Sequence, residues 1–339
     1  MAILITGGAG YLGSHTCLQM LAAGYDIVVL DNLSNSSEES LHRVRKISGI
    51  QFSFINADIR NKLTLRAVFQ QHSFSAVIHF AGLKAVGEST QKPLTYYDNN
   101  IVGSINLFEV MSEFNVKTIV FSSSATVYGD PASVPINEDF ALNATNPYGR
   151  SKLMIEDILR DLRASDSTWR IGLLRYFNPI GAHSSGLMGE DPNGIPNNLL
   201  PYVSQVAVGR LEKLRVFGND YDTHDGTGVR DYIHVMDLAD GHVAALGYLL
   251  RNETMITLNL GTGIGYSVLD VVNAFAKVSS RVVPYVFLPR RLGDVAINYA
   301  DAGLAKRLIG WTATRNLEEM CADTWKWQSI NPKGYSQTA

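Results

Sequence analysis

The sequence predicts an α/β fold in which a doubly wound parallel sheet is followed by a smaller C-terminal α/β domain. Short apolar, β-branched runs alternate with longer stretches of helical period. Strands that are apolar throughout and alternate with helices form parallel sheets covered on both faces. A chain of 339 residues also exceeds the size at which one hydrophobic core stops growing, so two domains are expected.

The strands of the first domain are expected at the apolar runs between the helical stretches. They are Ala2–Thr6, Ile27–Asp31, Phe52–Asn56, Ala76–Phe80, Thr118–Ser122 and Arg170–Tyr176. From Asn178 onward this pattern loosens into Gly-, Pro- and Asn-rich loops, notably Gly181–Asn198 and Gly218–Gly228. The predicted domains are therefore residues 1–177 and residues 178–339, with some segments of the second half returning to the first domain.

Composition and charge exclude several classes of protein. With 46% hydrophobic and 18% charged residues and no apolar run long enough to cross a bilayer, a soluble protein with no membrane partner is expected. A net charge of -3 without a basic block argues against a nucleic-acid partner.

The cysteines and the N-terminus bear on location. Cys17 and Cys321 have no disulfide, redox or metal spacing, and no signal peptide precedes Ala2–Thr6, so a cytoplasmic location is expected. The histidines lack a ligand spacing, and no metal is predicted.

The first predicted strand leads directly into a glycine-rich turn, Thr6–Gly13, and then into a helix. Gly8, Gly10 and Gly13 have the spacing G-x-G-x-x-G, and Gly7 replaces Gly8 in the overlapping spacing G-x-x-G-x-x-G. Glycine permits the turn and lets a pyrophosphate approach the helix N-terminus, whose dipole favours an anion. Alone, the turn is weak support for a ligand, because tight strand-to-helix turns also use glycine for steric reasons.

Asp31 strengthens the case for a dinucleotide because it ends the second predicted strand, where a carboxylate can accept hydrogen bonds from ribose hydroxyls. The alternative is an ordinary acid at a strand end. Asn32 and Leu33 supply no arginine for a 2′-phosphate, so NAD is expected rather than NADP. A second glycine-rich stretch, Gly261–Gly265, is interpreted as a structural turn before a helix that starts near Ser267.

Asn146, Pro147 and Tyr148 predict a helix start, with Asn as the N-cap and Pro at the first helical position. Lys152 follows Tyr148 by four residues, so the phenol and the ammonium share one helix face. The Lys152 charge, the helix N-terminus and a cationic nicotinamide ring are expected to lower the tyrosine pKa from its usual value of about 10, which would make Tyr148 a general acid or base. The alternative is that Tyr148 and Lys152 are a surface pair without a function, because a tyrosine and a lysine four residues apart are common in helices.

Three consecutive serines stand at the end of the fifth predicted strand. The carboxyl edge of a doubly wound sheet faces the ligand crevice, so Ser124 is expected to align a substrate hydroxyl with Tyr148. The alternative is a hydroxyl-rich strand end without a role.

Gly7–Gly13, Asp31, Ser124, Tyr148 and Lys152 together resemble the extended short-chain dehydrogenase/reductase family, which has a Rossmann fold, and more closely its UDP-galactose 4-epimerase branch. The resemblance extends from Met1 to Tyr335. It includes the ordered motifs Phe121–Gly129, Leu174–Pro179, Gly194–Leu199 and Gly226–His234. It implies a redox-neutral inversion of UDP-galactose and UDP-glucose at sugar C4: the tyrosine removes the proton of the 4-hydroxyl, the hydride passes to tightly held NAD, and it returns to the opposite face of the 4-keto sugar.

The resemblance also implies the residues of the site, with Ser124, Tyr148 and Lys152 as the catalytic group. The cofactor set comprises Gly7, Gly10, Tyr11, Leu12, Gly13, Asp31, Asn32, Asn35, Ser36, Asp58, Ile59, Phe80, Ala81, Lys84, Asn99, Tyr148, Lys152 and Phe177. The UDP-sugar set comprises Ser124, Tyr148, Asn178, Asn198, Leu199, Leu214, Val216, Phe217, Arg230, Arg291, Asp294 and Asn298. Arg230 and Arg291 suit a diphosphate, because a guanidinium group offers two parallel donors.

A homodimer is a further implication of the resemblance. The helical residues expected to form its seam are Leu107, Met111, Ile155, Ile158 and Leu162. The same residues are equally consistent with an ordinary core.

Asn298 departs from the pattern of relatives restricted to unsubstituted hexoses, which tend to carry tyrosine there. The smaller side chain predicts that UDP-N-acetylgalactosamine and UDP-N-acetylglucosamine are also substrates, and the alternative is that Asn298 lines the pocket without setting specificity. A sugar-nucleotide 4,6-dehydratase shares the fold, NAD and the Tyr-Lys pair, but typically carries Asp-Glu where this chain has Ala125 and Thr126. A second rival is a non-catalytic NAD-sensing binding protein, which can lose the tyrosine or the lysine.

Overall fold

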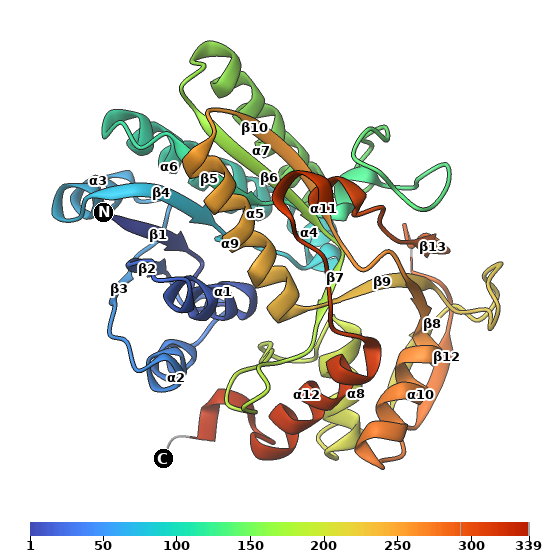
Figure 1. The fold of residues 1–339 in the computed structure, drawn as a ribbon. Helices are drawn as coiled ribbons and strands as arrows, with labels where there is room; N and C mark the ends of the chain where they lie inside the picture. Colours follow the sequence, from blue (N-terminus) through green and yellow to red (C-terminus); the bar gives the residue numbers. More distant parts are fainter. Residues whose placement is uncertain (292, 338–339) are drawn as a thin grey trace.

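The computed structural model describes residues 1–291 and 293–337. Its main element is a seven-stranded sheet with the order β10-β6-β5-β4-β1-β2-β3, in which all neighbours are parallel (Figure 1). The strands are β1 (Ala2–Thr6), β2 (Ile27–Asp31), β3 (Ser53–Asn56), β4 (Phe74–His79), β5 (Thr118–Ser122), β6 (Arg170–Tyr176) and β10 (Met255–Leu260). The predicted fold class is confirmed, and only β3 and β4 differ from the predicted strand bounds, by one or two residues.

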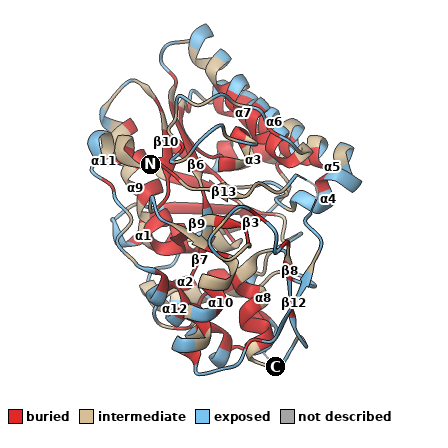
Figure 2. Ribbon diagram, turned by 90° about the vertical axis from the view of Figure 1, so that its right-hand side faces the viewer, coloured by how far each residue is buried: buried red, intermediate tan, exposed pale blue. Residues whose placement is uncertain are grey.

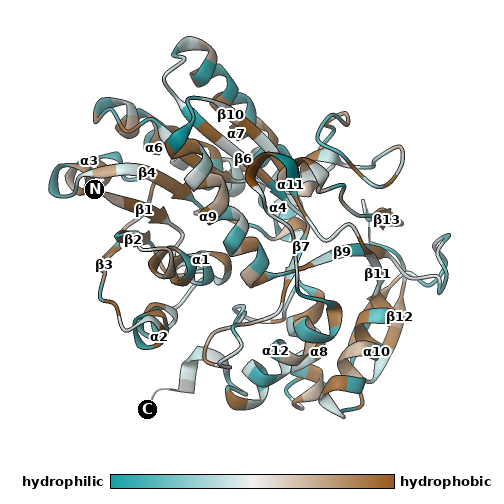
Figure 3. Cartoon of the chain, viewed as in Figure 1, coloured by the Kyte–Doolittle hydropathy of each residue, from teal (hydrophilic) through white to brown (hydrophobic). Residues whose placement is uncertain are grey.

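Helices cover both faces of this sheet. One face carries α1 (Tyr11–Ala22), α2 (Glu38–Ser48), α9 (Val235–Arg251) and α11 (Gly303–Ile309), and the other carries α3 (Lys62–Gln71), α6 (Gly103–Glu113) and α7 (Pro147–Ser165). The side chains of β1 alternate between the two cores: Ile3 and Ile5 pack with α1 and α9, and Leu4 packs with α3, α6 and α7. Because both faces are covered, the strands are hydrophobic along their length (Figure 3).

Shorter helical segments lie near the carboxyl edge of the sheet. They are α4 (Val86–Gln91), α5 (Pro93–Tyr97), the π-helical turn η1 (Asp98–Val102) and the 3₁₀ turn η2 (Ala125–Tyr128). Buried residues concentrate in the strands and on the inward faces of the helices (Figure 2). In the parts of the chain that the structure describes, no helix combines the length and the apolar composition needed to span a membrane.

The second half of the chain builds a smaller α/β unit around β9 (Val229–His234). Strand β9 pairs with β7 (Asn178–Ile180), β11 (Gly265–Ser267) and β13 (Ile297–Asn298), and β8 (Leu214–Phe217) pairs with β12 (Tyr285–Leu288). The helices are α8 (Leu199–Ala207), α10 (Val268–Ser279) and α12 (Leu317–Ile330), followed by the 3₁₀ turn η3 (Gly334–Gln337). Strand β10 and helix α9 come from this half but lie with the first sheet. The domain division between residues 177 and 178 stays a prediction.

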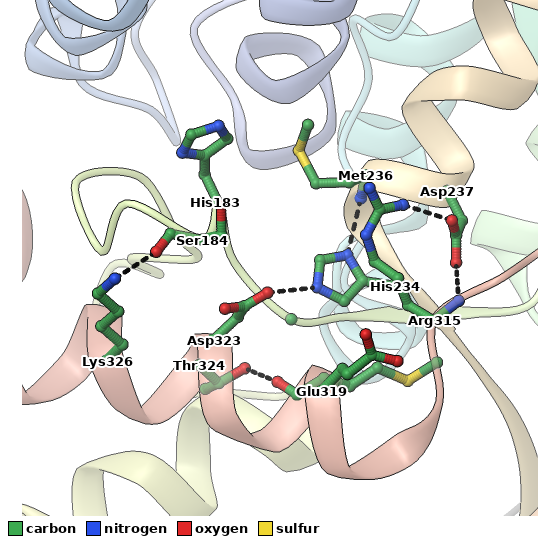
Figure 4. A network of polar contacts seen from close by, with 12 residues as sticks. His183, Ser184, His234, Met236, Asp237, Arg315, Glu319, Asp323, Thr324 and Lys326 are labelled. Atoms are coloured by element: carbon green, nitrogen blue, oxygen red, sulfur yellow. Dashed lines mark hydrogen bonds and ion pairs between the residues drawn. The ribbon is translucent and has the colours of Figure 1, made fainter.

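Polar contacts tie α12 to the rest of the chain (Figure 4). Asp323 Oδ2 lies 3.2 Å from Nε2 of His234, the residue that caps the N-terminus of α9. On the same side of α12, Lys326 Nζ donates to the carbonyl oxygen of Ser184 at 2.6 Å. Since Ser184 lies in the loop between β7 and α8, the C-terminal helix supports a loop that reaches the main sheet.

Candidate active site

A cleft opens at the carboxyl edge of the main sheet, next to β1 and β4. From β1 the chain continues outward to β2 and β3 and then returns to β4 on the other side of β1. The connections therefore leave β1 and β4 in opposite directions, which creates the crevice where open α/β sheets bind ligands. The glycine turn after β1 and the segment Phe80–Lys84 after β4 both line this cleft.

The glycine turn has the geometry of a phosphate cradle. Gly7 has a φ of +71°, and a Cβ there would lie 2.6 Å from the backbone nitrogen of Ala81. A Cβ on Gly13 would lie 2.2 Å from the Gly7 carbonyl oxygen, closer than van der Waals contact allows. Helix α1 begins at Tyr11, and its N-cap residue Gly10 provides no side-chain cap. The first amide groups of α1 are thus available to a pyrophosphate, so the residues present fit a dinucleotide.

Asp31 lies at the end of β2 and organises the adjoining loop. Its Oδ2 accepts a hydrogen bond from Ala9 N at 3.0 Å, and its Oδ1 accepts from Leu33 N at 2.9 Å and from Ser36 Oγ at 2.8 Å. The carboxylate therefore links the glycine turn to the loop that follows β2. Two oxygens with these few donors can still accept from ribose hydroxyls.

Most of the predicted cofactor residues line this one cleft. They are Gly7, Gly10, Tyr11, Leu12, Gly13, Asp31, Asn32, Asn35, Ser36, Ile59, Phe80, Ala81, Lys84, Asn99, Tyr148 and Lys152. Asp58 and Phe177 do not line it. Asp58 instead binds Arg60 and accepts from Asn32 Nδ2 at 3.0 Å, and Phe177 is buried in a small apolar cluster behind the cleft. Their roles as cofactor residues stay predictions.

Further cleft residues come from parts of the chain that the sequence patterns did not connect with the cofactor. They are Tyr176, Gly189, Glu190, Asp191, Pro192 and Tyr335. Tyr176 could have been predicted from the sequence, because it ends a predicted strand and directly precedes Phe177, a predicted cofactor residue. No sequence pattern predicts Glu190 or Tyr335 in the cleft, since the loop between β7 and α8 and the C-terminal turn η3 reach it only through tertiary packing.

Local structure places Tyr148 in the wall of this cleft, where it is buried. Asn146 caps α7, with its Oδ1 accepting from Gly149 N at 2.9 Å, and Pro147 occupies the first helical position. Tyr148 therefore stands in the first turn, as predicted. Lys152, one turn later, is buried and donates from Nζ to the carbonyl oxygen of Ser122 at 2.7 Å. The structure thus joins α7 to the end of β5 through the predicted catalytic lysine.

The pKa of Tyr148 does not follow the sequence prediction. Burial raises the pKa of Tyr148 well above its usual value, the phenol of Tyr176 raises it further, and a hydrogen bond with Ser124 lowers it. The Lys152 ammonium lies 6.0 Å from the centre of the Tyr148 ring and is engaged with a backbone carbonyl. Burial also lowers the pKa of Lys152 to about 8. In the protein alone, burial therefore outweighs any lowering of the phenol pKa by Lys152 and the helix N-terminus, and lowering with the nicotinamide ring bound stays a prediction.

A buried charged network supports the catalytic residues from behind. Glu156 lies one turn after Lys152 on α7 and receives two hydrogen bonds from Arg175 of β6, at 3.0 and 2.7 Å. Ser123 Oγ donates to Glu156 Oε1 at 2.6 Å. The side chains of Glu156 and Arg175 are 0% and 2% exposed, so this network locks α7 against β5 and β6 next to Ser124.

The predicted UDP-sugar residues lie on several elements of the smaller unit. Arg291 packs its guanidinium 4.8 Å from the Phe217 ring centre and pairs with Asp294 at 2.9 Å. Arg230 on β9 stands opposite Asn298 on β13.

The other predicted UDP-sugar residues are apolar or lie at the ends of elements. Leu214 and Val216 point into the apolar core and leave only backbone groups for a ligand. Asn198 precedes α8, with Leu199 as its first residue, and Asn178 begins β7. Their contacts with a substrate stay predictions.

In the second glycine-rich stretch, Gly261–Gly265, backbone amides are hydrogen-bonded to a side chain of the protein itself. Asp231 accepts hydrogen bonds from Thr262 N at 2.8 Å and from Gly263 N at 2.9 Å. Helix α10 then begins at Val268 with Ser267 as its N-cap. The interpretation of this stretch as a structural turn is confirmed.

Within the described residues, three potential metal ligands come together, His224, Asp225 and Asp270, with their ligand atoms within 4.8 Å of one another. Asp270 completes the capping box of α10 with Ser267, and Asp225 accepts from Thr227 N at 2.8 Å. Both carboxylates thus already serve as local hydrogen-bond acceptors. The absence of a metal in this protein stays a prediction.

A family model described as GDP-mannose 4,6 dehydratase matches residues 4–324. Among curated proteins, the chain is 63% identical over 335 residues to a UDP-glucose 4-epimerase of Bacillus subtilis (strain 168), covering 99% of both chains. It is 56% identical over 344 residues to a UDP-glucose 4-epimerase of Mus musculus, again covering 99% of both chains.

Two solved structures are also similar. The UDP-glucose 4-epimerase from Bifidobacterium longum, in complex with NAD+ and UDP, superposes with a TM-score of 0.96 at 52% identity, covering 98% of this chain and 100% of that chain. The UDP-Glc/GlcNAc 4-epimerase from Campylobacter jejuni superposes with a TM-score of 0.84 at 39% identity, covering 97% of this chain and 99% of that chain.

Proposed function

The chain belongs to the UDP-glucose 4-epimerase family of extended short-chain dehydrogenases/reductases, and from this premise we propose that it is an NAD-dependent isomerase that interconverts UDP-galactose and UDP-glucose. The observation that carries the proposal is the burial of Tyr148 and Lys152 in the wall of a dinucleotide cleft, with Ser124 also buried, two residues after the end of β5. A phenol held beside a dinucleotide site can act as general acid or base on a hydroxyl whose carbon exchanges a hydride with the cofactor.

The matching family model bears the description of a 4,6-dehydratase, which makes that reaction the nearest rival. Elimination of the 6-hydroxyl needs an acid and a base beyond the tyrosine. The positions after Ser124 hold Ala125, which cannot transfer a proton, and Thr126, whose hydroxyl donates to Ser124 Oγ at 2.9 Å. Since both members of the Tyr-Lys pair are present and buried, a non-catalytic NAD sensor is also disfavoured.

NAD would be held by the glycine turn and Asp31, and when bound it supplies the acceptor and donor for the hydride of sugar C4 together with a positive ring charge. Tyr148 removes the proton of the 4-hydroxyl when the sugar is oxidised and returns a proton to O4 when the 4-keto sugar is reduced, within the same turnover. Burial raises the pKa of Tyr148 in the protein alone, so the phenolate that accepts the proton would depend on the positive ring charge of the cofactor for its stabilisation. Ser124 orients the hydroxyl, and burial of all three side chains excludes water.

Inversion requires the sugar to present either face while its nucleotide stays bound. In the proposed mechanism Arg230, on β9 of the smaller unit, and Arg291 hold the diphosphate, so that the nucleotide stays bound while the sugar moves. The hexose can then turn between oxidation and reduction, and no net change in the cofactor results.

The test is an incubation of the purified protein with UDP-galactose and no added NAD. UDP-glucose is the expected product, measured by chromatography. A 4-keto-6-deoxy sugar would instead identify a dehydratase, and unchanged UDP-galactose in a protein that carries NAD would identify a sensor.

The proposed substrate range includes the N-acetylated pair. Asn298 lies on the short strand β13 opposite Arg230 and is partly buried. Its replacement by tyrosine is expected to lower kcat/KM for UDP-N-acetylgalactosamine by about tenfold or more, because a larger side chain fills the space that a 2-N-acetyl group would need. Turnover of UDP-galactose should change much less, and both rates are measured with each sugar.

Asn298→Ala is the matched control for this substitution, because it keeps the space open and should retain N-acetyl turnover. Two results would contradict the proposal. One is no N-acetyl turnover by the natural protein. The other is an equal change for both sugars in Asn298→Tyr.

A homodimer is also proposed, with a revised interface. Of the five residues predicted for the seam, Leu107, Met111 and Ile155 are buried in the core of a single chain, so they do not form an exposed seam. Ile158 and Leu162 are partly buried and pack against the same core. The outer faces of α6 and α7 instead present Ile105, 37% exposed, and Met154, 43% exposed. Light scattering should give twice the chain mass of 37.2 kDa, and a single-chain mass at micromolar concentration would exclude the dimer.

A cytoplasmic location is proposed from the cysteines. Cys17 and Cys321 are both free and buried, as is usual in proteins of reducing compartments. Fractionation of source cells should place the epimerase activity with cytoplasmic marker enzymes, and its recovery in another fraction would overturn the proposal.

A further inference from the structure

Glu190 is an unassigned acidic residue in the wall of the cofactor cleft. It lies in the loop between β7 and α8 and lines the same cleft as Tyr11, Lys84 and Tyr148. Its side chain is only 9% exposed. A carboxylate removed from water in this way is costly unless its oxygens find donors, so its contacts indicate what the site is built to bind.

The two carboxylate oxygens of Glu190 have different surroundings. Oε1 accepts hydrogen bonds from Lys84 Nζ at 3.0 Å and from Asn198 Nδ2 at 2.7 Å. Oε2 is buried and has no donor among residues 1–291 and 293–337. A buried acceptor without a donor is destabilising and uncommon in native proteins. The missing donor is therefore expected from a bound ligand.

The loop that carries Glu190 is held in place by the C-terminal helix. Trp327 Nε1 donates to the backbone carbonyl of Glu190 at 3.3 Å. Lys326, the preceding residue of α12, donates to the carbonyl oxygen of Ser184 near the start of the loop (Figure 4). With its backbone fixed and one oxygen engaged, the carboxylate is preorganised toward the cleft rather than free to turn to solvent.

The partners of Glu190 place it between the two ligands of the proposed function. Lys84 is a predicted cofactor residue and Asn198 a predicted UDP-sugar residue. A carboxylate repels a phosphate but accepts strongly from a hydroxyl. We propose that Glu190 binds a hydroxyl group of the bound ligands through Oε2, either a ribose hydroxyl of the dinucleotide or a hydroxyl of the hexose. This inference rests on the proposed function.

The test compares Glu190→Gln and Glu190→Asp with the natural holoenzyme. The first variant removes the charge, and the second keeps the charge but withdraws it by one methylene. Loss of a hydrogen bond to a charged acceptor is expected to weaken one ligand by about tenfold or more. Less NAD retained per chain and a higher dissociation constant of NAD would indicate that Glu190 binds a ribose hydroxyl. A higher KM or a lower kcat for UDP-galactose at saturating NAD would indicate that Glu190 binds a hexose hydroxyl.

Glu318→Gln is the matched control, because Glu318 also pairs with a lysine, Lys277 at 2.6 Å, but is 61% exposed and outside the cleft. It should leave NAD affinity and turnover unchanged. The proposal is overturned if NAD affinity, KM and kcat all stay within twofold in Glu190→Asp and Glu190→Gln proteins that melt like the natural one. If Glu190→Gln does not fold, Glu190→Asp alone decides.

Failure of the proposed function gives a different result. In that case the natural protein does not convert UDP-galactose. Titrations of NAD and of UDP-glucose into the natural protein and the Glu190 variants still show whether Glu190 binds a ligand hydroxyl.

Discussion

Tyr148→Phe is expected to lower kcat for UDP-galactose by about a hundredfold to ten-thousandfold, the contribution of a positioned general acid or base. The substitution removes only the hydroxyl, and the ring keeps its buried place in the first turn of α7. The bound NAD per chain and the melting temperature should therefore stay close to those of the natural protein. The measurement is kcat at saturating substrate, with cofactor content determined on the same samples.

Tyr248→Phe provides the matched control, because Tyr248 lies on α9 and does not line the cleft. Its activity should equal that of the natural protein. If Tyr148→Phe keeps more than about a tenth of the natural kcat, well above what loss of a general acid or base allows, Tyr148 does not transfer the proton and the mechanism is wrong.

Arg175→Met is expected to lower the free energy of unfolding by about 3–5 kcal/mol, because it removes the buried partner of the Glu156 carboxylate and leaves only Ser123 and the partly exposed Arg160 as donors. Burial raises the pKa of Glu156, but hydrogen bonds from Arg175 and Ser123 outweigh burial and lower it below its usual value. Chemical denaturation measures the loss. The double variant Arg175→Met/Glu156→Met should recover most of it, since apolar side chains can replace a buried pair.

The sign of the pH dependence distinguishes this explanation from a general packing defect. In the natural protein the lowered pKa of Glu156 contributes stability above the unfolded pKa of about 4.3, and this contribution is lost as the pH falls. In Arg175→Met the pKa of Glu156 rises because burial is no longer opposed by Arg175, so protonation at low pH removes the buried charge. The difference between the two proteins should shrink from pH 7 to pH 4.

Arg170→Met is the control for Arg175→Met, because Arg170 pairs with Glu253, whose side chain is 69% exposed. An exposed pair contributes about 0–1 kcal/mol, so only a small loss is expected. Equal losses in the two variants, or a loss in Arg175→Met that does not depend on pH, would contradict the role of the buried pair.

The parts of the site that could be predicted from sequence depend on local patterns. The glycine spacing, Asp31 at a strand end and the Asn146-Pro147 helix start all act over a few residues, and each lies where it was predicted. Parallel strands bring their carboxyl ends to one edge of a sheet, so these local signals also converge in space. For the same reason Tyr148 and Lys152 could be placed in one cleft.

Other features depended on contacts between distant segments. Leu214 and Val216 were predicted to contact the UDP-sugar, but the packing of β8 turns their side chains into the core. Glu190 enters the cleft because α12, more than a hundred residues later, supports its loop. No periodicity or spacing in the sequence reports such a contact.

The sequence by itself predicted the α/β class, six of the seven strands of the main sheet to within two residues, and the candidate catalytic group, because these follow from hydrophobic period, turn chemistry and helix capping. Only the tertiary structure decided the electrostatics of that group. The pKa of Tyr148 is raised rather than lowered since burial depends on everything packed around the phenol. Desolvation is a property of the folded surroundings, and it cannot be read from residues four positions apart.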